Sequence, residues 1–135
     1  MRLAICYVSN SSSDLSPKEI HELLSDCQSQ NNKRNIKGLL LYSEGNFFQV
    51  IEGDTQEVKT LWTEIKQDER HKSIIKIFEE EIETPPFDGY LCDFISEDEK
   101  HPQHNLKRIF DQLKSLDEKP KNAAEEVLKL FLKCH

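Results

Sequence analysis

The sequence predicts an α+β fold in which two helices cover one face of a mixed sheet. Short apolar runs typical of strands alternate with two amphipathic helical segments, in the order βαββαββ. Both helical stripes need an apolar surface to bury against, and one sheet can supply it for both. The 135 residues allow a single core and a short appended element. These observations predict a ferredoxin-like arrangement followed by two C-terminal helices.

The first strand and the first helix have the clearest local signals. Residues 3–8 are mostly apolar and precede a serine-rich loop, so we expect a buried strand with Tyr7 near its end. Ser16, followed by proline, and Glu19 match a capping box, which predicts that a helix begins here. The apolar stripe of this helix has i, i+3, i+4, i+7 spacing and consists of Ile20, Leu23, Leu24 and Cys27. The polar stretch 28–35 ends the apolar pattern.

A hairpin and a second helix are expected next. Residues 38–42 and 46–51 are strand-like and are joined by a short connection containing Gly45, which can supply the positive φ of a tight turn. Asp54 and Glu57 can cap the following helix. Its stripe repeats the same spacing and consists of Val58, Leu61, Trp62 and Ile65.

Two further strands and a helical extension complete the chain. Residues 73–82 and 89–95 read as strands separated by a proline pair. The composition then turns polar, so the expected domains are 1–96 and 97–135. The extension holds two more amphipathic segments, which could cover the open face of the sheet or pair with another subunit. A small homo-oligomer is expected.

The two helices of the extension have local signals of their own. Asn122 with Glu125 can cap the second of them, which is expected to end near Cys134. The first carries an apolar stripe of Leu106, Ile109, Phe110 and Leu113.

Composition and spacing argue against several classes of function. The formal net charge of -7 is unsuited to holding nucleic acid. Widely spaced cysteines without a CxxC pair and an N-terminus without a signal peptide indicate a reduced, cytoplasmic protein. No apolar run approaches the roughly 20 residues that span a bilayer. The HxxH pair His101 and His104 lies in a polar loop and is interpreted as surface, and no glycine-rich phosphate loop occurs, so no metal site is predicted.

Polar side chains inside apolar runs are the informative feature. Burial without a partner would cost roughly 1 to 3 kcal/mol each. Tyr7 is one such residue, and Gln49, inside the run FFQVI, needs both a donor and an acceptor. Each position also has a plain interpretation. Gln49 could face solvent on an alternating strand, and Asn31 could be a helix cap.

In combination these residues resemble the BLUF domains, a family of blue-light sensors that use flavin, over about residues 1–95. The residues that carry the resemblance are Tyr7 with Ser9, Asn31 seven positions before Gly38, the run from Gly38 to Gly53, and the segment Asp68, Glu69, Arg70 and His71.

The resemblance implies a flavin, FAD or alternatively FMN, held non-covalently between the two helices. Leu23 and Leu24 would contact one side of the ring and Ile65 the other, while Asn31 would bond its polar edge. An ion-pair cluster on the surface is the other interpretation of the segment around Arg70. The implied flavin contacts are Tyr7, Leu23, Leu24, Asn31, Gln49, Ile65, Asp68, Arg70 and His71.

The resemblance also implies the photochemistry. Tyr7 would donate an electron and a proton to the excited flavin, and the Gln49 amide would relay the proton. That amide would then rotate or tautomerise and offer a hydrogen bond to the flavin C4 carbonyl, which shifts the absorption to the red. Darkness would reverse the change and no substrate is turned over, so the chain is expected to signal to a partner protein and not to act as an enzyme.

Two positions differ from the common pattern of the family. Tyr90 and Cys92 stand on the last strand where many members have tryptophan and methionine. Cysteine is shorter than methionine and a weak S–H donor, so the relay from Gln49 is expected to differ. Tyr90 is interpreted as filling the space of the tryptophan, and Trp62 as a packing residue. The alternatives are a protein-interaction module without chromophore and, more weakly, an acylphosphatase-like hydrolase.

Overall fold

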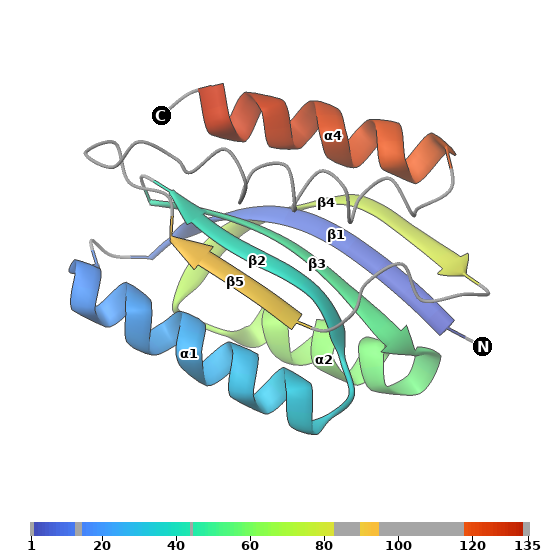
Figure 1. Cartoon of the computed structure of the whole chain (residues 1–135), viewed down its shortest axis with the longest axis horizontal. Coiled ribbons are helices and arrows are strands. Elements are labelled where there is room, and N and C mark those ends of the chain that lie inside the picture. The colour runs from blue at the N-terminus through green and yellow to red at the C-terminus, as the bar shows by residue number, and fades with distance from the viewer. Residues whose placement is uncertain (1, 13–14, 44, 83–89, 95–117, 134–135) are drawn as a thin grey trace.

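The computed structural model describes residues 2–12, 15–43, 45–82, 90–94 and 118–133 (Figure 1). The predicted order βαββαββ with a helical extension is confirmed. The elements are β1 (Arg2–Ser11), α1 (Pro17–Lys33), β2 (Lys37–Ser43), β3 (Asn46–Asp54), α2 (Thr55–Gln67), β4 (His71–Ile82), β5 (Tyr90–Phe94) and α4 (Glu118–Lys133).

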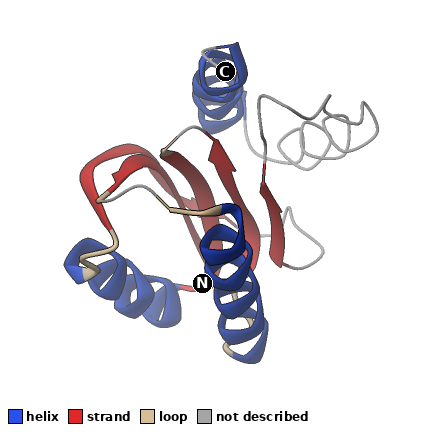
Figure 2. Cartoon of the chain, turned by 90° about the vertical axis from the view of Figure 1, so that its left-hand side faces the viewer, coloured by secondary structure: helices blue, strands red, loops and turns tan. Residues whose placement is uncertain are grey.

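The five strands form one mixed sheet in the order β4-β1-β3-β2-β5. Neighbouring strands are antiparallel except β2 and β5, which are parallel. Helices α1 and α2 lie on one face of the sheet and α4 on the other, so the molecule has three layers (Figures 1 and 2). Because both faces are covered, β2 and β3 are buried along nearly their whole length.

Helices α1 and α2 bury their stripes against the same face of the sheet, as predicted. Leu3 and Ile5 of β1 point to this face and pack with residues of both helices. Each helix begins at its predicted cap. Ser16 accepts a hydrogen bond from the Glu19 amide at 3.2 Å and the Glu19 carboxylate accepts one from the Ser16 amide at 3.2 Å, which completes the capping box. The Asp54 carboxylate caps α2 through the Gln56 amide.

Helix α4 covers the opposite face of the sheet, which is one of the two roles that the sequence left open. Ala124 and Leu128 are fully buried there in a cluster that includes Cys6 and Phe78. The prediction that Asn122 caps this helix is wrong, because the helix already begins at Glu118. Its proline lies in the first turn, where a missing N–H costs no helical hydrogen bond. The predicted stripe of residues 106–113 lies outside the described residues.

Gly38 fixes how β2 lies against β3. Its φ is +139°, and a Cβ at this position would lie 1.9 Å from the backbone oxygen of Val50. Only glycine permits such a close approach of two backbones. The contact sets the register in which Leu40 of β2 lies opposite Gln49 of β3.

Candidate functional site

Four residues from four neighbouring strands form a row across the sheet. Tyr7 of β1 pairs with Gln49 of β3, Gln49 pairs with Leu40 of β2, and Leu40 pairs with Cys92 of β5. By the same parallel pairing, Tyr90 lies opposite Gly38. The backbone therefore places Cys92 two strands away from Gln49, and the side chains of Tyr90 and Cys92 lie outside the described part of the chain.

The centre of this row is a hydrogen bond from the Tyr7 hydroxyl to the Gln49 side-chain oxygen Oε1. Both residues are buried, with 3% and 4% of their surface exposed. Gln49 therefore does not face solvent, which had been the plain interpretation of its position. Burial raises the pKa of the Tyr7 phenol well above its ordinary range, so the phenol keeps its proton and remains the donor.

The Tyr7–Gln49 pair forms part of the floor of a half-open cleft between α1 and α2. The cleft encloses about 700 Å³ of empty space, open solvent included. Its lining residues are Tyr7, Leu23, Cys27, Gln30, Asn31, Arg34, Leu40, Phe47, Gln49, Leu61, Glu64, Ile65, Asp68, Arg70 and His71.

Eight of the nine implied flavin contacts line this cleft, because all except Leu24 are among its lining residues. Leu24 is 4% exposed and lies instead in the core between α1 and the sheet. Leu23 comes from α1 and Ile65 from α2, so the two walls each supply an apolar side chain.

Asn31 supplies a buried amide at one end of the cleft. It lies in the last turn of α1 and is 5% exposed. The C-cap of the helix is Arg34, so Asn31 is not the cap that its position suggested. The helix continues through most of the polar stretch because its other side chains there reach solvent.

His71 connects three elements around the cleft. Its Nε2 lies 2.6 Å from the Ile65 carbonyl oxygen and its Nδ1 lies 2.7 Å from Ser9 Oγ. A carbonyl only accepts, so Nε2 carries a proton and donates it. The ring also packs edge-on against Tyr7, with centroids 6.0 Å apart, and against Phe47 at 6.2 Å. Both nitrogens are thus used to tie the start of β4 to β1 and α2.

Asp68 and Arg70 form a compact ion pair at the other end of the cleft. Arg70 donates from Nη2 to Asp68 Oδ2 at 2.6 Å, and from its backbone N–H to Oδ1 at 2.9 Å. These hydrogen bonds hold the pKa of the Asp68 carboxyl below its usual range. The Arg70 side chain is 57% exposed, so this end of the cleft opens to solvent.

Several lining residues gave no signal in the sequence. Arg34 and Glu64 are charged residues at the ends or outer faces of helices, where composition predicts only a solvated surface. Trp62 does not line the cleft. Its ring packs against Tyr7 with centroids 5.3 Å apart, and Lys66 Nζ lies 5.6 Å from the centre of the indole.

The donors and walls of the cleft suit a flat heteroaromatic ring with one polar edge. Each wall supplies apolar side chains, Leu23 from α1 and Leu61 and Ile65 from α2, while two buried amides, Asn31 and Gln49, present donors and acceptors to the interior. Within the described residues no group of three or more His, Cys, Asp or Glu could hold a metal ion. Nor does any helix in the described part have the length and apolarity to cross a membrane.

Comparison with known proteins identifies the ring. The family model BLUF, described as sensors of blue-light using FAD, matches residues 3–92. The chain is 32% identical over 77 residues to the blue light- and temperature-regulated antirepressor BluF of Escherichia coli (strain K12). That match covers 57% of this chain and 19% of BluF, so the chain spans less than a fifth of this relative.

Solved structures agree with the match. BlrP1 of Klebsiella pneumoniae with FMN and cyclic diGMP superimposes with a TM-score of 0.68 at 25% identity, over 81% of this chain and 29% of that one. The structure titled BlrP1 BLUF has a TM-score of 0.73 at 22% identity, over 97% of this chain and 89% of that chain, and supports the fold. The matched module is a sensor and not a catalyst. Since the family model covers most of the sequence, the chain belongs to the BLUF family of flavin-binding blue-light sensors.

Proposed function

We propose that this chain binds FAD in the cleft between α1 and α2, uses Tyr7 and Gln49 as the photoactive pair, and signals to a separate partner protein. The observation that carries the proposal is the buried hydrogen bond from the Tyr7 hydroxyl to Gln49 Oε1 in the floor of the cleft. A phenol and an amide so arranged can exchange a proton without any movement of the backbone.

A bound flavin would supply the absorption of blue light and an excited state able to take up one electron. Loss of an electron makes the Tyr7 phenol a strong acid, and Gln49 Oε1 is already its hydrogen-bond acceptor. Because a charged group is costly at this buried site, the proton leaves with the electron. Gln49 stays neutral when it accepts this proton at Oε1 only if its amide nitrogen releases a proton toward the ring that would lie in the cleft, and this leaves the imidic acid tautomer. Return of the proton and the electron to Tyr7 can then leave the amide as the tautomer or in a rotated form, which changes the donors it presents to the cleft.

The remaining contacts follow from the walls of the cleft. Leu23 and Ile65 would hold the two faces of the ring, and Asn31 would bond its polar edge. Leu24 would act from the core by fixing the position of α1. Asp68, Arg70 and His71 surround the open end, where the ribityl chain and phosphate would leave the cleft.

FAD is proposed over FMN because the description of the family names FAD, and FMN stays the alternative because one structural neighbour contains it. The chromophore released on denaturation, identified by chromatography against both standards, decides between them. We further propose that residues 1–96 are the sensor and 97–135 an extension, and that the protein is cytoplasmic and homo-oligomeric. Tyr90 and Cys92 are proposed as output residues because their strand, β5, pairs with β2, and β2 is next to the strand that carries Gln49.

The deciding experiment compares absorption spectra of the purified, FAD-loaded protein before and after blue light. The expected result is a small red shift that recovers in darkness. Gln49→Leu should keep the flavin but lose the shift, because leucine cannot form a hydrogen bond. A colourless protein that takes up no flavin, or a full shift in Gln49→Leu, would overturn the proposal.

A further inference from the structure

An ion pair joins the two walls of the cleft at the end where Asn31 lies. Arg34 is the C-cap of α1, and its guanidinium reaches across to α2. It donates from Nη1 to Glu64 Oε1 at 3.2 Å and from Nη2 to Glu64 Oε2 at 3.1 Å. Its Nε lies 3.6 Å from Glu57 Oε2. A bidentate pair of this kind fixes both the distance and the orientation of its partners.

The position of this pair differs from that of an ordinary surface pair. Arg34 and Glu64 both line the cleft, and Arg34 lies three residues after the buried Asn31, so the two occupy adjacent positions on α1. The Arg34 side chain is 26% exposed, whereas the side chains of Glu64 and Glu57 are 56% and 52% exposed. Arg34 is therefore the more buried member of each pair.

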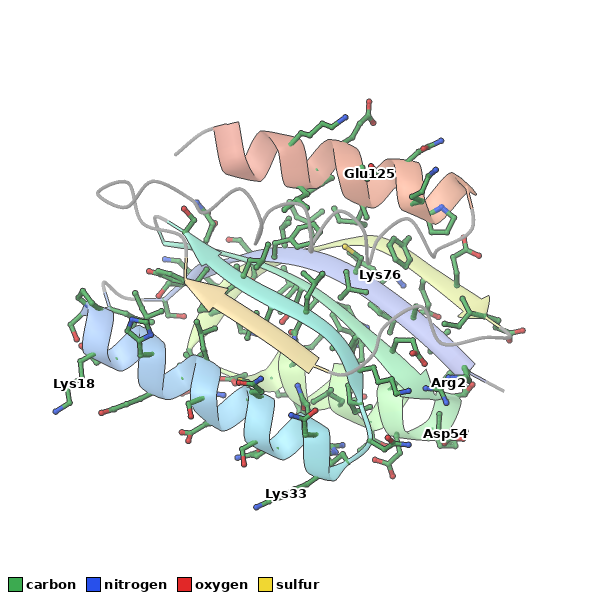
Figure 3. The ribbon with its side chains drawn as sticks, in the orientation of Figure 1. Arg2, Lys18, Lys33, Asp54, Lys76 and Glu125 are labelled. Atoms are coloured by element: carbon green, nitrogen blue, oxygen red, sulfur yellow. The ribbon has the colours of Figure 1, made fainter. Side chains whose placement is uncertain are left out.

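The neighbouring Lys33 differs from Arg34 in the direction of its side chain. It stands at the same end of α1, but its side chain points away from the sheet into solvent (Figure 3). At the opposite end of the cleft no such tie is seen among the described residues. There Arg70 pairs with Asp68 two positions away in sequence, and both also line an adjoining cavity that is open to solvent.

We propose that Arg34 is a retention residue for the flavin, because its pair with Glu64 ties α1 to α2 and keeps the walls of the cleft from parting. The proposal rests on the proposed binding of flavin in this cleft. A flat ring gripped between two helices leaves faster when the walls can move apart, and the walls are joined where Arg34 crosses. Loss of the pair would then speed dissociation through the open end of the cleft.

A different role for Arg34 predicts an effect of opposite sign. If the guanidinium contacted the flavin directly, Glu64→Gln would free its charge for the ligand and slow dissociation. If Arg34 acts by joining the helices, Glu64→Gln weakens the joint and dissociation becomes faster. Exposed bidentate pairs support a change of about two- to fivefold in rate.

The test measures how fast FAD leaves the loaded protein, from the recovery of flavin fluorescence after dilution. Arg34→Met and Glu64→Gln should each raise the rate about two- to fivefold, and the double variant should not exceed the larger single effect. Lys33→Met is the matched control and should leave the rate unchanged. Higher salt should speed dissociation from the unmodified protein more than from Arg34→Met.

A second measurement uses the protein without flavin. Amide hydrogen exchange in residues 28–36 and 57–67 should be faster in Arg34→Met and Glu64→Gln than in Lys33→Met, because the helices are no longer joined. Unchanged rates and exchange in both variants, or slower dissociation from Glu64→Gln, would overturn the role of Arg34 while leaving the light response intact. If the unmodified protein does not bind flavin, the proposed function is overturned instead. The hydrogen-exchange measurement would still test whether the pair of Arg34 and Glu64 joins the two helices.

Discussion

Tyr7 and Gln49 lie directly opposite each other on β1 and β3, and the Tyr7 hydroxyl donates a hydrogen bond to the Gln49 amide oxygen. The bond joins two adjacent strands across the floor of the cleft between α1 and α2. A change in the orientation of one amide therefore alters both the contacts inside the cleft and the link between the strands. The first prediction tests the donor side of this bond.

Tyr7→Phe removes the hydroxyl and keeps the ring. We expect the variant to bind FAD and to lose the light-induced red shift, because phenylalanine has no proton to give to Gln49 Oε1. The light-minus-dark absorption difference measures this. Tyr42→Phe is the matched control, since Tyr42 is also buried and packs against Phe47 with centroids 4.9 Å apart. The control should keep the shift, and a full shift in Tyr7→Phe would contradict the donor role.

The stability of the protein should fall in alkaline solution. Burial raises the pKa of the Tyr7 phenol and of the Cys6 thiol well above their ordinary ranges. Both folded pKa values lie above the unfolded values of roughly 10 and 8.5. Each group thus contributes stability that is complete below its unfolded pKa and is lost as the pH rises toward its folded pKa.

Urea titrations at a series of pH values test this expectation. The free energy of unfolding should decline from about pH 8.5 upward. Cys6→Ala should flatten the decline that begins near pH 8.5, and Tyr7→Phe the part above about pH 10. The slope against pH is the measurement, so a lower stability of either variant at neutral pH does not affect it. Slopes unchanged in both variants would contradict the burial of these groups.

The sequence could predict the elements because their signals are local. The capping box of Ser16 and Glu19 and the two helical stripes depend on residues within one or two turns. It could not predict the face on which Gln49 lies. Both faces of β3 are buried, so the strand lacks the alternation that would have assigned its sides.

Local sequence patterns also could not predict contacts between segments that are far apart in the chain. Arg34 and Glu64 are thirty residues apart in sequence, and each alone resembles a solvated charge. The ion pair between them can be inferred only once α1 and α2 are known to pack side by side. The start of α4 was missed for another reason, because a proline in a first helical turn reads equally well as a residue before the helix.

His71 should control how firmly Tyr7 is held. His71→Phe keeps an aromatic ring beside Tyr7 and Phe47 but removes the hydrogen bonds to Ser9 and the Ile65 carbonyl. The loss of two partly buried hydrogen bonds should lower the free energy of unfolding by about 1–3 kcal/mol. With Tyr7 less restrained, recovery in the dark should be faster.

Ser9→Ala separates the two hydrogen bonds of His71. It removes only the Nδ1 partner and leaves the bond to Ile65, so its effects on stability and on dark recovery should be smaller than those of His71→Phe. Recovery kinetics after a light pulse and urea unfolding give both quantities. If His71→Phe recovers at the rate of the unmodified protein, the ring does not position Tyr7.

Among the glycines that the structure describes, Gly38 should be the least tolerant of substitution. In Gly38→Ala the new Cβ would lie 1.9 Å from the Val50 backbone oxygen, at a φ of +139° that L-residues rarely adopt. Strands β2 and β3 must then separate, at a cost of more than about 3 kcal/mol in the free energy of unfolding. Gly45→Ala has a φ of +81° but meets no atom within 4 Å, so only backbone strain of about 1–2 kcal/mol applies. Urea unfolding of the two variants compares these costs. Because the register at Gly38 also places Leu40 opposite Gln49, Gly38→Ala should weaken flavin binding beyond its effect on stability, whereas Gly45→Ala should bind FAD normally. Equal costs in the two variants would show that the strands can part at Gly38 without loss.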